Sequence, residues 1–234
     1  MRTKLTALLV TAAAVAAGAV AAQAAPIPVA VYTFQTQDDV SAFHKVFGER
    51  CKRKWQGRER LSVNVGRSTN SCAFRSSVLG DSSATKSDHG MVATVGVSGG
   101  TPKLRRRAFA GVGVRQSDNA GYVLRVLPNL RKWQFLRDPE GSGGPKLEAA
   151  GSGKFIRLGA KPNVIAIRAF SRGGTSTSII ASVNGRTVVS TTDSGQDQPS
   201  GRRTVVTAGV KGSGAARGIM GLFDNVTVQV PNPF

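Results

Sequence analysis

The chain has 234 residues, with 32 Lys and Arg against 13 Asp and Glu, a formal net charge of +19 and two cysteines. Abundant glycine, recurrent Val, Ile, Thr and Ser, and the lack of a long apolar stripe at helical spacing exclude a mainly helical protein. A surface this basic attracts polyanions, although a general excess of arginine in a secreted protein would give the same net charge.

The first 24 residues read as a secretory signal peptide. Arg2 and Lys4 precede an uncharged apolar run over residues 5–22, and Ala22-Gln23-Ala24 supplies the small-x-small pattern of a cleavage site. The alternative is an uncleaved membrane anchor, since the run is just long enough to span a bilayer. We expect cleavage after Ala24 and a secreted mature chain, residues 25–234, without a transmembrane segment.

The next segment contains the one predicted helix and both cysteines. Residues 29–34 are a strand candidate, and residues 38–47 a helix candidate. Cys51 and Cys72 form an even pair in an exported chain, which predicts one disulfide. Trp55 lies in the most basic stretch, residues 51–60, where its ring could stack on a sugar or a base. The alternative is a surface loop onto which this tryptophan folds back as a lid.

From residue 61 onwards, short segments of alternating apolar residues follow one another with turn formers between them, which predicts β-strands. Asn184-Gly185 between two β-branched runs predicts a tight hairpin. None of the connections resembles a crossover helix, so we expect an all-β fold: one sandwich domain of two antiparallel sheets. The expected strands cover residues 61–65, 72–79, 91–97, 111–115, 121–127, 131–137, 163–170, 177–183, 186–191, 203–208, 218–222 and 225–230.

Three arginines of these strands suggest a binding surface. Alternation along a strand places Val112 and Val114 on one face and Arg115 on the other. Arg115, Arg125 and Arg168 each follow an apolar strand pair, so their guanidinium groups could project from one solvated sheet face. Such a face would bind carboxylate, sulfate or phosphate groups, which match the guanidinium fork. Ordinary solvated positions are the alternative.

Two aromatic side chains in the same region are further candidates for ligand binding. Tyr122 and Trp133 could each offer a flat platform for a sugar ring. The alternative is that both belong to the hydrophobic core, which would leave the arginines without an aromatic neighbour.

The sequence gives no positive sign of an active site. The Glu-x-Asp-x-(x)-Glu pattern of glycosidases is absent, and Asp138-Pro139-Glu140 is better explained as a turn. A Ser-His-Asp triad would need His44 or His89, and Asp88-His89 lies in a polar segment that we interpret as a solvated loop. A lyase stays open, because its base could be Tyr, Lys, Arg or His.

No Cys or His residues occur at the spacing of a zinc site. Asp224 is a candidate ligand of a structural calcium ion, but calcium needs six to eight oxygens and the sequence indicates one. An Asx turn is the alternative. Apart from that calcium candidate we expect no metal and no cofactor.

Between residues 107 and 230, short motifs occur in a characteristic order: GVGVR at 111–115, NAGY at 119–122, the strand 133–137, NVIAIRAF from Asn163, VNG at 183–185 and GLFDNV at 221–226. In this order they resemble the concanavalin A-like lectin/glucanase superfamily, the jelly roll that also includes laminin G-like modules. The resemblance implies one convex and one concave sheet, adjacent first and last strands, and glycan binding on the concave sheet and its rim loops.

The export signal, the resemblance and the missing carboxylate pair together predict a secreted, non-catalytic, lectin-like module that acts as a monomer on an anionic or neutral cell-surface glycan. One alternative is a polysaccharide hydrolase or lyase of the same fold. The other is a non-specific polyanion binder or a structural envelope protein. No specific nucleic-acid motif is present.

Overall fold

The computed structural model describes residues 26–57, 59–76, 88–117, 120–139, 144–172, 175–212 and 215–230. The predicted signal peptide, residues 77–79 of one predicted strand and most of the polar segment before Asp88 lie outside the described residues. So does Glu140, one half of the carboxylate pair considered above.

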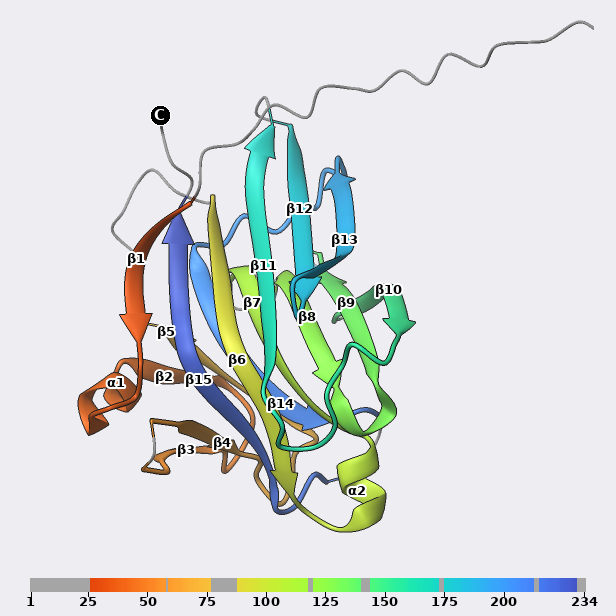
Figure 1. Cartoon of the computed structure of the whole chain (residues 1–234). Coiled ribbons are helices and arrows are strands. Elements are labelled where there is room, and N and C mark those ends of the chain that lie inside the picture. Colours follow the sequence, from red (N-terminus) through yellow and green to blue (C-terminus); the bar gives the residue numbers. More distant parts are fainter. Residues whose placement is uncertain are drawn as a thin grey trace, which may run out of the picture.

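The described residues form two antiparallel sheets packed face to face, as the alternating pattern predicts (Figure 1). Sheet A has the order β13 (Arg186–Asp193), β12 (Ser176–Val183), β11 (Asn163–Arg172), β6 (His89–Gly99), β15 (Ile219–Val230), β4 (Leu61–Asn64) and β3 (Lys52–Trp55), with β1 (Ile27–Tyr32) also paired to β15. Sheet B has the order β10 (Lys146–Ser152), β9 (Lys132–Asp138), β8 (Gly121–Leu127), β7 (Ala108–Gln116), β14 (Arg203–Val210), β5 (Ser71–Ser76) and β2 (Phe43–Phe47).

The first and last strands lie side by side, as the resemblance implies. β1 pairs antiparallel with the second half of β15, and β4 pairs with the first half of the same strand. At the other side of the molecule the two sheets end in β13 and β10, which have a neighbour on one side only. These two edge strands lie on the same side of the sandwich, at the right in Figure 1, and the candidate site lies between them.

The core fills the space between the sheets. Val112 and Val114 of β7 and Leu124 of β8 are fully buried and face the buried Ile165 and Ile167 of β11 in the same apolar cluster. Burying a side chain of this size stabilises the fold by about 1.5–3 kcal/mol. The alternation that predicts the inner face of these strands is therefore confirmed.

The Asn184-Gly185 hairpin is also confirmed. Asn184 and Gly185 have φ angles of 50° and 79°, the left-handed values that a tight turn between β12 and β13 needs at both central positions. The Asn184 side chain fixes the turn, because its Oδ1 accepts from the Val164 amide at 2.8 Å and its Nδ2 donates to the Phe155 carbonyl at 2.7 Å.

The structure differs from the prediction in three segments. Only the first half of the helix predicted at residues 38–47 is helical, as α1 (Gln37–Ser41), because Phe43 turns into the core and starts β2. The run Arg105-Arg106-Arg107, between two predicted strands, lies mostly in a helix that was not predicted, α2 (Pro102–Arg106), which Thr101 caps. The last two predicted strands are one strand, β15, interrupted by a bulge at which Asn225 has a φ of 47°.

The predicted disulfide between Cys51 and Cys72 is present, with 6.0 Å between the Cα atoms. Cys51 directly precedes β3 of sheet A and Cys72 lies in β5 of sheet B, so the bridge links the two sheets. Both cysteines are buried. The segment between them contains β3, which was not predicted, and β4, which confirms the strand predicted at residues 61–65.

We expect the Cys51→Ser/Cys72→Ser double variant to lower the free energy of unfolding by about 3 kcal/mol, because the loop of roughly 20 residues gains freedom in the unfolded chain. Urea unfolding with and without a reducing agent measures this loss. Reduction should destabilise the wild type by the same amount and leave the double variant unchanged, whereas a loss below about 1 kcal/mol would contradict a role in joining the sheets.

Candidate functional site

The three predicted arginines do not share a sheet face, and that part of the prediction is wrong. Arg168 lies exposed on the outer face of sheet A, because β11 belongs to that sheet. Arg125 lies on the outer face of sheet B. Arg115 is buried between the two sheets. The structure therefore brings none of these guanidinium groups onto a common surface, and their roles in ligand binding remain predictions.

Arg115 leaves the alternating pattern because its backbone has a φ of 51°. The pairing of β7 with β14 also slips by one residue at this point, between Arg203 and Val205. A bulge of this kind turns a side chain to the other face of its strand. As a result Arg115 is only 4 % exposed and reaches across to sheet A, where it contacts Asp88, Ser171 and Thr177.

The predicted aromatic residues also occupy three different places. Tyr122 is fully buried and stacks near Phe135 in the core, although its hydroxyl reaches the edge of the sandwich. Trp133 is half-buried and packs against the core from β9, next to the edge strand β10. Trp55 is 46 % exposed, and its indole donates to the Phe34 carbonyl at 2.8 Å, as expected for a ring that folds back onto the surface.

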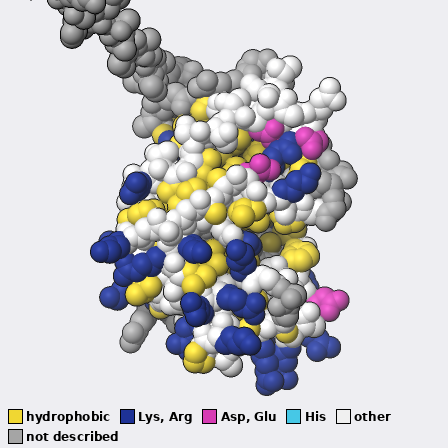
Figure 2. Space-filling view, turned by 90° about the vertical axis from the view of Figure 1, so that its right-hand side faces the viewer, with side chains coloured by type: hydrophobic (Ala, Val, Ile, Leu, Met, Phe, Trp, Pro, Cys, Tyr) yellow, Lys and Arg dark blue, Asp and Glu magenta, His cyan; other side chains and the backbone are white. Residues whose placement is uncertain are grey.

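A cleft of about 540 Å³ opens between the two edge strands, and we call it the edge cleft. Figure 2 views the molecule from this side, and acidic and basic side chains adjoin near its upper end. Sheet B contributes Tyr122, Phe135 and Arg137 to the walls, and sheet A contributes Ile179, β13 and the loop that follows β13. The cleft therefore combines an apolar interior with polar groups at one end.

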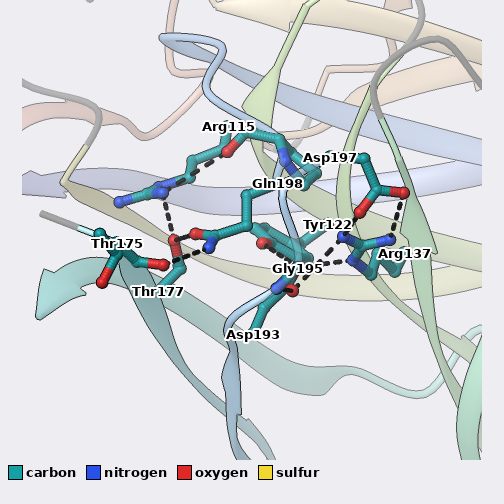
Figure 3. Close-up of polar contacts among 10 residues, drawn as sticks. Arg115, Tyr122, Arg137, Thr175, Thr177, Asp193, Gly195, Asp197 and Gln198 are labelled. Atoms are coloured by element: carbon teal, nitrogen blue, oxygen red, sulfur yellow. Dashed lines mark hydrogen bonds and ion pairs between the residues drawn. The ribbon is translucent and has the colours of Figure 1, made fainter.

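One arginine organises the polar end of the edge cleft (Figure 3). Arg137 points inward from β9 and forms ion pairs with Asp193 at the end of β13 and with Asp197 in the following loop, at 2.5 and 2.6 Å. The Tyr122 hydroxyl donates to the same Asp193 oxygen as Arg137 Nε, Oδ2, at 2.7 Å. The Gly195 amide also donates to Asp193, at 3.0 Å. The cluster thus joins sheet A to sheet B through four side chains and one backbone amide.

The surroundings keep both carboxylates ionised. Burial alone would raise the pKa of Asp193, but hydrogen bonds from Arg137, Tyr122 and the Gly195 amide outweigh burial and lower it. The hydrogen bond from Arg137 lowers the pKa of Asp197. In turn Asp197 and Asp193 raise the pKa of Arg137. Burial and the bond to Asp193 raise the pKa of Tyr122, which stays a neutral donor.

A second cleft of about 600 Å³ lies on the other side of the loop 194–200. Here the Thr177 hydroxyl donates to Gln198 Oε1 at 2.7 Å, and Gln198 Nε2 donates to the Thr175 carbonyl at 2.7 Å. Arg115 donates to the same Thr177 hydroxyl (Figure 3). The loop between the two clefts is therefore held by side chains on both of its sides.

Sheet B carries a third hollow, of about 430 Å³, on its outer face. Gly111 lies at an outward position of β7, in register with Arg125, and leaves the middle of this face without a side chain. The Arg125 guanidinium covers the Phe109 ring at 4.5 Å, and burial lowers its pKa to about 10. The walls are mainly apolar, with Phe47 57 % exposed at one side.

The remaining predicted site residues, His89 and Asp224, do not form a second cluster of polar side chains. His89 is buried at the start of β6 and accepts the Arg115 amide at 2.9 Å, so the solvated loop predicted for it is wrong. Asp224 has a buried Oδ1 without a hydrogen-bond partner, and burial raises its pKa. Among the described residues no group of three or more His, Cys, Asp or Glu could hold a metal ion. The calcium hypothesis for Asp224 stays a prediction.

Within the described segments, no helix has both the length and the apolar character needed to cross a bilayer. No protein-family model matches the chain. No curated protein matches it either.

Solved structures do resemble this one in fold. The carbohydrate-binding module CBM66 from Bacillus subtilis has a TM-score of 0.55 at 16 % identity, over 80 % of this chain and 95 % of that one. An endo-1,3-beta-glucanase from Streptomyces sioyaensis has a TM-score of 0.54 at 12 % identity, over 78 % and 79 %. A carbohydrate esterase of the Shiga toxin-encoding bacteriophage phi24B has a TM-score of 0.52 at 11 % identity, over 89 % and 100 %.

These similarities confirm a β-sandwich shared with carbohydrate-binding modules and a glucanase, and they identify no family. Sequence reasoning missed Arg137, Asp193 and Asp197. The one available signal is the pair of aspartates four residues apart in the polar segment after the strand predicted at residues 186–191. That signal is weak, because nothing in the sequence says that β9 brings an arginine to the same place.

Proposed function

We propose that this chain is a secreted, non-catalytic carbohydrate-binding protein that holds a neutral glycan in the edge cleft. The observation that carries the proposal is the Asp193–Arg137–Asp197 cluster at the mouth of the cleft. Carboxylate oxygens accept hydrogen bonds from sugar hydroxyls, and a guanidinium donates to them. A sugar with two adjacent hydroxyls can therefore bind to both partners of an ion pair.

The exposure of the cluster suits a ligand. The Asp197 side chain is 50 % exposed, whereas those of Arg137 and Asp193 are 14 % and 11 % exposed. Two groups are thus held rigidly by their neighbours and one faces the solvent, an arrangement that reduces the entropy lost on binding. The half-buried Val188 beside them can pack against the C–H face of a sugar ring.

Acid catalysis of glycoside hydrolysis is disfavoured at this cluster. A glycosidase needs one carboxyl group with a raised pKa to protonate the leaving oxygen. The pKa values of Asp193 and Asp197 are both lowered, and the causes are the hydrogen bonds from Arg137 and its neighbours. Two ionised carboxylates fixed on one arginine favour binding over proton transfer. The proposal therefore keeps the non-catalytic prediction.

Three further observations support an extracellular carbohydrate-binding role. The sequence begins with a predicted export signal. The disulfide fits an oxidising compartment. The fold is also that of a named carbohydrate-binding module, which at 16 % identity speaks for the scaffold alone.

Binding of the mature chain to a glycan array at low and high salt tests the proposal. We expect a small set of neutral glycans whose binding persists at high salt, because hydrogen bonds in a cleft are screened less than surface charge. Asp197→Asn should weaken these signals by about tenfold, since one charge-assisted hydrogen bond is worth about 1.5–3 kcal/mol.

Arg168→Gln, on the outer face of sheet A, is the matched control and should bind like the wild type. Two results would contradict the proposal. One is an array on which no neutral glycan is bound. The other is neutral-glycan binding that Asp197→Asn leaves unchanged.

A further inference from the structure

Basic side chains gather at the end of the sandwich opposite the polar end of the edge cleft. Figure 2 shows them crowded at the lower end of the molecule, where Figure 1 places α2. Four chain segments meet there: residues 97–107, 128–132, 152–162 and 184–187. Together they contain ten lysines and arginines and no aspartate or glutamate. We call this surface the basic end.

Hydrogen bonds between the segments show that the basic end is one continuous surface. The Asn129 side chain donates to the Arg105 carbonyl at 2.9 Å and joins the β8–β9 turn to α2. Arg131 donates to the Lys154 carbonyl at 3.1 Å and joins that turn to the β10–β11 connection. The Asn184 side chain donates to the Phe155 carbonyl at 2.7 Å and adds the β12–β13 hairpin.

The guanidinium groups of the basic end are held by neutral partners. Arg105 donates to the carbonyls of Gly99 and Gly100 at 3.0 and 3.1 Å, and Arg157 donates to the Pro162 carbonyl at 3.2 Å. Arg186 lies 5.1 Å over the Phe155 ring. None of the ion pairs found between described residues includes a lysine or arginine of the basic end. Several side chains of the basic end are therefore held in place by neutral groups, while its positive charge has no ion-pair partner among the described residues.

The one aromatic side chain of the basic end, Phe155, is half-buried and lies under the Arg186 guanidinium, so it offers little surface on which a base could stack. The large apolar side chain exposed here is Leu158, whereas the exposed aromatic ones, Phe47 and Trp55, belong to β2 and β3 at the far edges of the sheets. Proteins that bind single-stranded nucleic acid combine positive charge with aromatic stacking. Charge without stacking fits an anionic chain that has no bases.

We propose that the basic end is a second binding site, separate from the edge cleft, for an anionic polysaccharide. Its sulfate, phosphate or carboxylate groups would lie along the row of arginines and lysines, and arginine forks suit such groups bidentately. The proposal is independent of the function assigned to the edge cleft, because the two sites share no residue and lie at opposite ends of the strands.

Two variants that each remove four positive charges test this proposal. The patch variant is Lys103→Gln/Arg106→Gln/Lys154→Gln/Lys161→Gln, at four exposed positions of the basic end. The control variant is Lys45→Gln/Lys52→Gln/Lys54→Gln/Arg67→Gln, at four exposed positions near β2 and β3. Binding to dextran sulfate, neutral dextran and polyuridylic acid is measured over a range of salt concentrations.

We expect dextran sulfate to bind the wild type. The patch variant should bind it at least about tenfold more weakly, and the slope of its log affinity against log salt concentration should be smaller by about 3. The affinity of the control variant should change by less than about threefold. Neutral dextran should not bind the basic end, and Asp197→Asn should bind dextran sulfate like the wild type. Equal losses in the patch and control variants would overturn the proposal, because net charge alone would then explain binding. If polyuridylic acid binds more tightly than dextran sulfate at equal negative charge, the choice of an anionic polysaccharide as the ligand would be overturned.

Discussion

Replacing Arg115 by methionine should lower the free energy of unfolding by about 3–4 kcal/mol, near the lower end of the cost of breaking a buried ion pair, because Arg115 is buried but its partner Asp88 is 30 % exposed. The Arg115 side chain is 5 % exposed and donates to Asp88 at 2.9 Å. It also donates to the hydroxyls of Ser171 and Thr177. Methionine fills a similar volume but satisfies none of these groups, so sheet A and sheet B lose a polar connection at this end.

Urea unfolding of Arg115→Met and of Arg168→Met measures this effect. Arg168 is exposed, and its replacement should cost less than about 0.5 kcal/mol. A loss below about 1 kcal/mol in Arg115→Met would contradict a structural role for this arginine and would restore the possibility that it serves a ligand.

Replacing Arg137 by methionine should have the second largest effect and should act on stability and binding together. The ion pair with Asp193 is mostly buried, so its loss should cost about 2–3 kcal/mol at pH 7, less than a fully buried pair because the cleft admits water. The pair with the half-exposed Asp197 adds little to stability. Glycan binding in the edge cleft should be lost, since the guanidinium that orients both carboxylates is removed.

The same variant should change how stability depends on pH. Because the pKa values of Asp193 and Asp197 are lowered in the folded chain, their stabilising contribution is complete above the unfolded pKa of about 4. It disappears as the pH falls through the folded pKa values. Wild-type stability should therefore decline below about pH 4, and Arg137→Met should show a smaller decline.

Urea unfolding at pH 7, 5, 4 and 3 measures both effects. Lys132→Met, at an exposed position of the same strand, is the control and should keep the wild-type stability and its acid dependence. An Arg137→Met variant that matched this control in stability, or that lost as much stability on acidification as the wild type, would contradict the arrangement of charges described above.

The fold was predictable because its rules are local. Alternation identifies the inner face of β7 from Val112 and Val114, and the Asn184-Gly185 pair identifies the hairpin between β12 and β13. Both depend on neighbouring residues alone. The helix predicted at residues 38–47 is wrong in its second half because Phe43 packs into a core built from distant segments, and such packing overrides local preference.

The candidate site was less predictable because it depends on strand order. Arg137 lies 56 residues before Asp193 and 60 residues before Asp197 in the chain. The three side chains meet because β13 is the edge strand of sheet A, and β9 lies next to β10, the edge strand of sheet B. The predicted site residues failed to converge for two reasons. β11 belongs to a different sheet from β8, and a single left-handed residue turns Arg115 inward.

The location of the bound glycan tests the central claim most directly. A neutral oligosaccharide selected on the array is titrated into the isotopically labelled mature chain, and amide and arginine side-chain NMR signals are followed. We predict shifts at Gly195, Asp197 and the Arg137 side chain, with the signals of Phe109 and Arg125 unchanged. Shifts confined to Phe109, Arg125 and their neighbours on the outer face of sheet B would contradict binding in the edge cleft.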